Sequence, residues 1–283
     1  MYVNTADVNP SMAQLEERKQ QERDLHDLIR GEGKGEARYT ANKKYYSVAG
    51  DSNVRFVRDW LAARVTGKDV LDYCCGNGET SLWLAAHGAN VFGIDISPVS
   101  VQNATAAAAE AGLRDRARFV VMDAEQMEFP DGRFDFVTVN GVLHHLDLDK
   151  AYAELARVLR PGGQVIATES LRHNPVIQWY RRLTPQMRTP WEVDHILGKS
   201  EIFAAERSFG RVEVAGFFHL FTILAVPFRK TAVFRPLLGL LSAIDALALR
   251  LPLVKWQAWM AVFVLSDPKK AAAAGPSTAV VRG

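Results

Sequence analysis

The sequence is poor in cysteine: its 283 residues include two, and these are the neighbours Cys74 and Cys75. Neighbouring cysteines argue against a structural disulfide and against a four-ligand zinc site. No segment reaches the roughly 20 apolar residues that a membrane-spanning helix needs. Residues 1–30 have no apolar core behind a basic start, so we expect no signal peptide. These absences favour a protein of the reducing cytoplasm.

An excess of charge of one sign is also missing. The formal net charge is +2, from 34 basic and 32 acidic residues. Nucleic-acid-binding domains gather basic residues into a stripe, and the sequence has none, so we expect no nucleic-acid partner. A hydrophobic content of 48% is ordinary for a globular protein of one or two domains.

A strand, a glycine turn and a helix are predicted in succession near residue 75. Val70 to Asp72 has the character of a buried strand that ends in an acid, Gly76 and Gly78 allow a tight turn, and residues 79–87 are helical. The third position of a dinucleotide motif G-x-G-x-x-G would be Ser81. The turn therefore predicts a bound ligand with polar groups, and is weak evidence for a dinucleotide.

Three later strands also end in a polar side chain. Residues 90–95 end in Asp95, 117–123 in Asp123 and 134–140 in Asn140, and helices alternate with these strands up to a fifth strand. This alternation predicts a doubly wound α/β fold with a mostly parallel sheet. Ligands bind at the carboxyl ends of such strands. Each acid alone could merely cap the helix that follows it.

Residues 53–170 resemble the class I S-adenosylmethionine (SAM)-dependent methyltransferases. The run Val70 to Gly78 is similar to the family's first motif, and Phe134 to Val137 and the turn Pro161-Gly162-Gly163 are similar to later ones. One position departs from the family, because its first glycine is Cys74 here, and a non-glycine residue tolerates positive φ poorly. The resemblance implies a seven-stranded sheet whose last strand is antiparallel.

The resemblance also implies a set of cofactor-binding residues. Cys74, Gly76 and Gly78 would meet the methionine end, Asp95 the ribose, Asp123 and Ala124 the adenine, and Asn140 the region of the sulfonium. Asp72 and Ile96 complete the set, and Tyr45 or Tyr46 would fold over the cofactor as a lid, with simple packing as the alternative.

Histidines are the candidate catalytic residues, because a hydroxyl acceptor needs a base whose pKa lies near the working pH. His144 and His145 follow the fourth strand, and the sequence does not distinguish them. Packing at a helix start is their alternative role. His195, beside Asp194, is a further candidate base, with a structural loop histidine as its alternative. No cluster of metal ligands is evident.

The chain divides into an arm, a domain and a tail. We expect residues 12–30 to be a solvated helix rather than a dimer contact, and the apolar, basic-flanked 228–255 to wall a lipophilic pocket rather than touch a membrane surface. The expected parts are an N-terminal helical arm and lid at 1–50, a methyltransferase domain at 51–268 with an acceptor-covering segment at 171–200, and a disordered tail at 269–283.

These patterns predict methyl transfer from SAM to a small, lipophilic molecule, at oxygen or nitrogen rather than carbon. A catalytically silent SAM-binding module that acts through its arm is the first alternative. A nicotinamide dehydrogenase is the second, although no obvious Tyr-x-x-x-Lys or other hydride-transfer pair lies near the fourth and fifth strands. Turnover separates the enzyme from the module.

Overall fold

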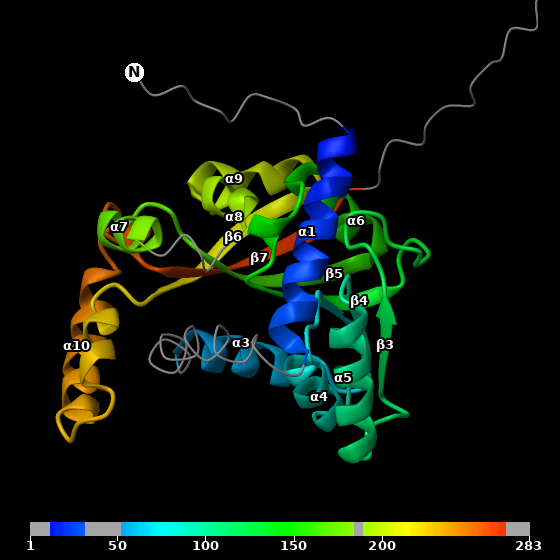
Figure 1. Cartoon of the computed structure of the whole chain (residues 1–283), viewed down its shortest axis with the longest axis horizontal. Coiled ribbons are helices and arrows are strands. Elements are labelled where there is room, and N and C mark those ends of the chain that lie inside the picture. Colours follow the sequence, from blue (N-terminus) through cyan, green and yellow to red (C-terminus); the bar gives the residue numbers. More distant parts are fainter. Residues whose placement is uncertain (1–11, 32–51, 184–188, 270–283) are drawn as a thin grey trace, which may run out of the picture.

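The computed structural model describes residues 12–31, 52–183 and 189–269 (Figure 1). Within them, seven strands form one sheet in the order β3-β2-β1-β4-β5-β7-β6. Strands β1 to β5 run parallel, and β7 lies antiparallel between β5 and β6. The strands are β1 Asp69–Tyr73, β2 Asn90–Asp95, β3 Ala117–Val121, β4 Phe134–Asn140, β5 Leu159–Ser170, β6 Phe209–Phe218 and β7 Met260–Pro268. The predicted doubly wound sheet and its antiparallel last strand are confirmed.

Helices cover both faces of this sheet. One face carries α3, α4 and α5, and the other carries α6 and α9 (Figure 1). The α-helices are α1 Met12–Arg30, α3 Ser52–Ala62, α4 Glu79–Ala86, α5 Pro98–Glu110, α6 Leu148–Val158, α7 Pro175–Leu183, α8 Pro190–His195, α9 Lys199–Ala204 and α10 Phe234–Ala248. Short 3₁₀ turns are η2 Leu143–His145, η4 Ala205–Arg207, η5 Thr222–Phe228 and η6 Lys255–Gln257. None of the described helices is both long and apolar enough to cross a bilayer.

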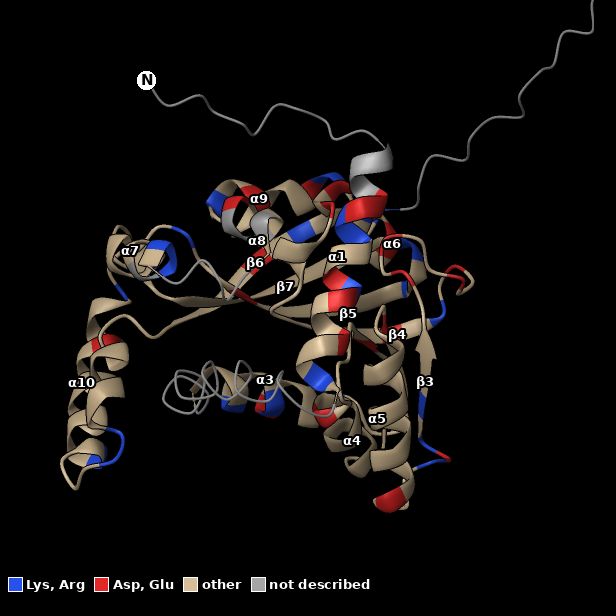
Figure 2. Cartoon of the chain, viewed as in Figure 1, with Lys and Arg blue, Asp and Glu red and all other residues tan. Residues whose placement is uncertain are grey.

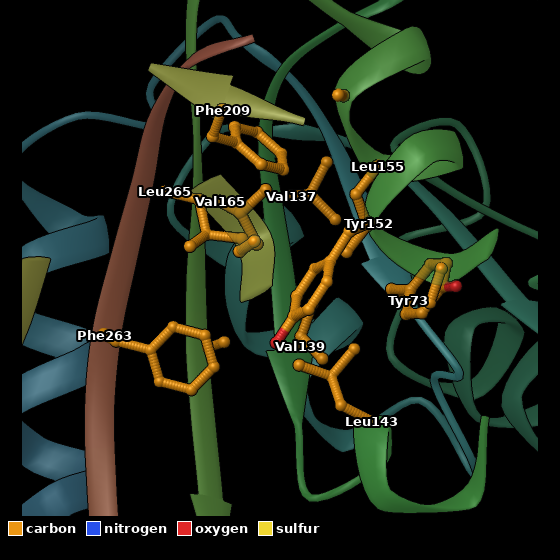
Figure 3. Packing of buried hydrophobic residues seen from close by; sticks show 14 of the residues in the cluster. Tyr73, Val137, Val139, Leu143, Tyr152, Leu155, Val165, Phe209, Phe263 and Leu265 are labelled. Atoms are coloured by element: carbon orange, nitrogen blue, oxygen red, sulfur yellow. The ribbon is translucent and has the colours of Figure 1, made fainter. Parts of the chain in front are cut away.

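Alternate residues of the central strands build two hydrophobic clusters. Val137 and Val139 of β4 face the same cluster as Tyr152 and Leu155 of α6, and all four are buried (Figure 3). Burial of one such aliphatic side chain stabilises a protein by about 1.5–3 kcal/mol. This packing fixes α6 against β4, and so fixes the short segment between them, which includes η2.

The first five strands of the sheet lie close to where the sequence predicts them, whereas the C-terminal third of the chain differs from the prediction. Strand β6 begins at Phe209, five residues before the uncharged run that starts at Val214. It is an edge strand in which Arg211 and Glu213 alternate with partly buried valines, so its charged residues hid it. The expectation that residues 228–255 wall a pocket is wrong for α10, where Leu240, Ile244 and Leu247 are exposed.

Cys74 adopts a left-handed backbone conformation, which glycine, the residue of the family motif at this position, adopts without strain. Its φ is +59°, the left-handed region, which costs a non-glycine residue about 1–2 kcal/mol. Cys75 N donates to Ile94 O at 2.8 Å immediately after it. The turn therefore keeps the shape of a glycine turn at some cost in stability.

Candidate functional site

A cavity opens at the carboxyl ends of the parallel strands. Its empty volume, which includes space open to solvent, is about 680 Å³. The residues proposed from the sequence that line it are Cys74, Asp95, Ile96, Asp123, Ala124, Asn140 and His145. Four strand ends thus bring these residues into one site.

The glycine turn beneath the cavity is held by buried carboxylates. Gly76 N donates to Asp95 Oδ2 at 2.9 Å. A Cβ on Gly78, whose φ is +82°, would lie 2.9 Å from Ala104 Cβ, so a side chain there would push α5 away. Gly78 therefore lets α4 and α5 approach each other.

Asp72 lies under the turn and does not line the cavity. Ser81 Oγ donates to its Oδ2 at 2.6 Å, and burial raises the pKa of Asp72 to about 6 even though that hydrogen bond opposes the rise. Ser81, the residue that replaces the third glycine of a dinucleotide motif, therefore binds a carboxylate of the chain itself. Asp72 braces the turn from below.

Helix α1, which lies in front of the sheet in the view of Figure 1, lines this cavity, so the expectation that it is a solvated arm is wrong. Arg18, Glu22, His26 and Arg30 follow one another at intervals of four along α1 and line the cavity. Arg18 and Glu22 are 4% and 6% exposed. Because residues four apart share one face of a helix, the inward face of α1 is ionisable rather than apolar. A search for apolar periodicity misses such a face.

The cations of α1 pair with acids at the strand ends. Lys19 Nζ lies 2.6 Å from Asp123 Oδ2, and Arg30 Nη1 lies 3.3 Å from Asp95 Oδ2. Burial lowers the pKa of Lys19, but the ion pair with Asp123 outweighs it and leaves the pKa raised. Arg18 bridges Glu125 and the carbonyl oxygen of His145. The acids assigned to ribose and adenine therefore both hold α1.

The two adjacent histidines have different surroundings. His144 is buried, and its Nδ1 lies 2.8 Å from Glu169 Oε2, while Glu169 Oε1 accepts from the backbone nitrogens of Val142 and Leu143. His145 instead lines the cavity, and its Nδ1 lies 3.1 Å from Glu22 Oε2 on α1. His144 is thus part of the scaffold of η2, and His145 faces the space where a substrate could bind.

Glu22, His26 and His145 form an ionisable cluster that the sequence did not reveal. Their ligand atoms lie within 4.8 Å of one another, and two imidazoles with one carboxylate could hold a metal ion such as zinc. Burial, helped by the charges of Arg30 and His145, lowers the pKa of His26 to about 4. Burial raises the pKa of Glu22, but hydrogen bonds with His145 and Thr189 outweigh that effect and lower it. A neutral His26 thus lies beside an ionised Glu22.

The remaining candidates lie elsewhere. His195 is exposed, stacks on Trp191 at 3.7 Å between ring centroids and has Nδ1 2.7 Å from Trp191 O, so it is not brought to the cavity. Trp191 itself lies over Arg18, and Thr189 Oγ1 donates to Glu22 Oε1 at 2.7 Å. The start of α8 therefore packs on α1. Tyr45 and Tyr46 lie outside the described residues.

Comparison with known proteins agrees with this geometry. The sequence profile of the methyltransferase domain family matches residues 71–167, which run from β1 through β5 and include the strand ends that line the cavity. Residues 71–167 therefore form a methyltransferase domain, and the chain as a whole resembles the class I SAM-dependent methyltransferases. It is 40% identical over 144 residues to a probable chloroplastic tocopherol O-methyltransferase of Oryza sativa, a match that covers 47% of this chain and 37% of that protein. The chain thus spans well under two thirds of that relative.

Two solved structures share the fold of this methyltransferase domain. Phosphoethanolamine N-methyltransferase 2 of Haemonchus contortus, in complex with SAM, aligns with a TM-score of 0.59 at 19% identity, over 87% of this chain and 60% of that one. Geranyl diphosphate C-methyltransferase of Streptomyces coelicolor aligns with a TM-score of 0.54 at 14% identity, over 76% and 78%. These names specify nitrogen and carbon, and the tocopherol relative oxygen, so the likeness does not select the acceptor atom.

The residues of the site fit a SAM molecule. The guanidinium of Arg30 packs against the glycine turn, since a Cβ on Gly76 would lie 3.0 Å from it. A guanidinium at this place matches the carboxylate of a methionine moiety, because the two groups form paired hydrogen bonds. The carboxylates of Asp95 and Asp123 are acceptors suited to ribose hydroxyls and an adenine amino group.

Proposed function

We propose that this chain transfers a methyl group from SAM to a small, lipophilic molecule at an oxygen or nitrogen atom that loses a proton. The observation that carries the choice of atom is His145, which lies in the cavity beside Glu22. The apolar character of the acceptor is supported by Ile96, Met122, Val142 and Leu146, which line the same cavity. It is also supported by the tocopherol relative and the geranyl diphosphate neighbour.

SAM supplies an activated methyl group on a positively charged sulfur. The chain's own contribution is to align an acceptor with that methyl group and to exclude water, and positioning of this kind can supply roughly 7–11 kcal/mol of a barrier. Helix α1 closes the mouth of the cavity through its ion pairs with Asp95, Asp123 and Glu125. For the cofactor to contact the first two acids, Lys19 and Arg30 must give up at least part of these pairs.

His145 would take the acceptor's proton. Its Nδ1 lies 3.1 Å from Oε2 of Glu22, whose pKa is lowered, so a carboxylate lies beside the imidazole that would become protonated. Glu22 then stabilises the imidazolium that forms. Because Glu22 belongs to α1, the base is held in place only while α1 covers the cavity.

A labelled-methyl assay on fractionated small-molecule and lipid extracts, with mass identification of the product, tests the activity. Once an acceptor is in hand, His145→Gln should lower kcat/KM by about 10²–10⁴-fold. Glu22→Gln should shift the lower limb of the pH profile of kcat/KM, since a neutral amide no longer stabilises the imidazolium. His195→Gln is the matched control and should keep the wild-type rate.

The outcomes of this assay test two proposals separately: that the chain transfers a methyl group, and that His145 acts as the base. Binding of S-adenosylhomocysteine without turnover on any fraction would contradict the activity and favour a silent cofactor-binding module. A wild-type rate of turnover in His145→Gln would contradict the role of His145 as base but would leave the proposed activity standing. Turnover that is lost on dialysis against EDTA and restored by zinc would show that the Glu22, His26 and His145 cluster holds a metal ion instead.

A further inference from the structure

Helix α10 exposes a continuous apolar stripe. Leu240, Ile244 and Leu247 follow at intervals of four and three residues, which places them on one side of the helix, and Leu251 follows in the turn beyond the end of the helix. Leu240, Leu247 and Leu251 are 60%, 66% and 55% exposed, and Leu253 just beyond them is 88% exposed. Exposed apolar surface of this extent marks an interaction site more often than a neutral surface.

The opposite side of α10 is held by packing and hydrogen bonds. These contacts fix the orientation of the helix, so its leucine stripe stays exposed. Leu241 packs with Ala225 and Val226 of η5. Buried Asp245 accepts hydrogen bonds from the backbone nitrogens of Leu220, Phe221 and Thr222 at 3.1, 2.7 and 3.3 Å. Helix α10 stands apart from the helices that cover the sheet (Figure 1), and the leucines of its stripe are exposed.

The charge around the stripe has one sign. Basic residues flank α10 at both ends, and Asp245 is the one acid between residues 228 and 255 and is buried (Figure 2). The basic residues are Arg229, Lys230, Arg235, Arg250 and Lys255. Leucines between basic residues suit the boundary between anionic head groups and acyl chains. A protein partner would match the leucines but would not by itself account for cations at both ends.

We propose that α10 and the turns beside it dock this protein onto the surface of an anionic lipid bilayer. The leucine stripe enters the head-group boundary and the basic residues meet the lipid phosphates. The inference stands on this surface and does not need the methyl acceptor, although a lipophilic acceptor would be met at a bilayer. Docking at α10 leaves the cavity under α1 intact, because no residue of α10 lines it.

Sedimentation with lipid vesicles tests the docking. The full chain should sediment with vesicles of phosphatidylglycerol and phosphatidylcholine, and at least about tenfold less with phosphatidylcholine alone, since each basic residue near an anionic surface adds to the binding. Leu247→Glu should lower binding to the anionic vesicles by at least about tenfold, because it places a carboxylate in the apolar stripe. Val120→Glu makes the same change on β3, the other edge of the sheet, where Val120 is exposed, and should bind like the wild type.

Two results would overturn the proposal. One is a wild-type protein that does not sediment with vesicles of any composition. The other is a dimer, seen by light scattering, that Leu247→Glu dissociates while vesicle binding is absent or unchanged, since α10 would then bind a second copy. Calorimetry with S-adenosylhomocysteine distinguishes a loss of vesicle binding from a loss of cofactor binding. Both variants should bind S-adenosylhomocysteine like the wild type.

Discussion

At Cys74 the sequence departs from the family motif while the backbone keeps the family's conformation. The glycine turn could be predicted from the sequence, but not whether Cys74 would bend it. The answer depends on neighbours distant in sequence: Cys75 N donates to Ile94 O of β2, and Gly76 N donates to Asp95. Bonds on both sides of the turn outweigh the preference of one residue.

Substitutions at Cys74 should expose this strain. Cys74→Gly should be more stable than Cys74→Ala by about 0.5–1 kcal/mol, because glycine escapes the left-handed penalty while losing more freedom on folding. Cys74→Val should be less stable than Cys74→Ala by a further 1–3 kcal/mol or so, since a β-branched residue is a poorer fit. Urea unfolding of the three variants measures both differences. Equal midpoints for glycine and valine would mean that residue 74 carries no strain.

The paired histidines show where sequence reasoning stops at this scale. The sequence placed both at the end of β4 but could not separate them, because the partner of His144 lies on β5 and the partner of His145 on α1. Neither partner is close in sequence. The acids and the amide that end the strands needed no such information, and Asp95, Asp123 and Asn140 do line the cavity as the sequence predicted.

Among the elements, α1 is the one whose role the sequence hid. Its limits, Met12–Arg30, agree with the predicted helix, but its inward face carries Arg18, Glu22, His26 and Arg30 in place of leucines. Charged residues at a spacing of four along a helix indicate a solvent-exposed face, unless residues of opposite charge elsewhere in the fold are known to pack against them. That set comes from two other segments of the chain: Asp95 from the end of β2, and Asp123 and Glu125 from the loop after β3.

The docking of α1 should weaken as the pH falls, through His26. A free histidine binds its proton near pH 6.5, whereas the pKa of docked His26 is lowered to about 4. The undocked state therefore binds more protons in this window, so docking is fully favoured above pH 6.5 and is progressively lost toward pH 4. Hydrogen-exchange protection of α1, corrected for intrinsic rates, should fall roughly twentyfold between pH 7 and pH 5.

The control for this effect is His26→Gln, which has no proton to gain. Its protection should vary much less with pH than that of the wild type, and the difference between the two proteins isolates His26 from Glu22 and His145. Equal pH dependence in both would contradict the assignment. Amides of β4, which is buried in the sheet interior, should change little in either protein.

At the scale of the whole molecule, the cofactor site joins segments from α1 to η2, so a ligand there should stabilise most of the domain at once. S-adenosylhomocysteine at 100 times its Kd adds about 2.7 kcal/mol. For a domain of this size, that should raise Tm by roughly 5–10 °C. Differential scanning fluorimetry with and without the ligand measures the shift.

Leu247→Glu serves as the comparison, because α10 contributes nothing to the cavity lining, and it should show the same shift as the wild type. A protein whose Tm does not respond to the ligand at any concentration would contradict cofactor binding itself. A shift that is present in the wild type and absent in Leu247→Glu would mean that α10 and the cavity are coupled.

The order of the strands has a consequence for folding during synthesis on the ribosome. Strand β7 comes last along the chain but lies between β5 and β6, so β6 leaves the ribosome with no neighbour to pair with. Until residue 268 has been synthesised, the nascent chain therefore carries two unpaired strand edges, one on β5 and one on β6, that the finished sheet does not have. Such edges are templates for aggregation, and chaperones acting late in translation would matter more for this protein than for one whose sheet is completed in chain order.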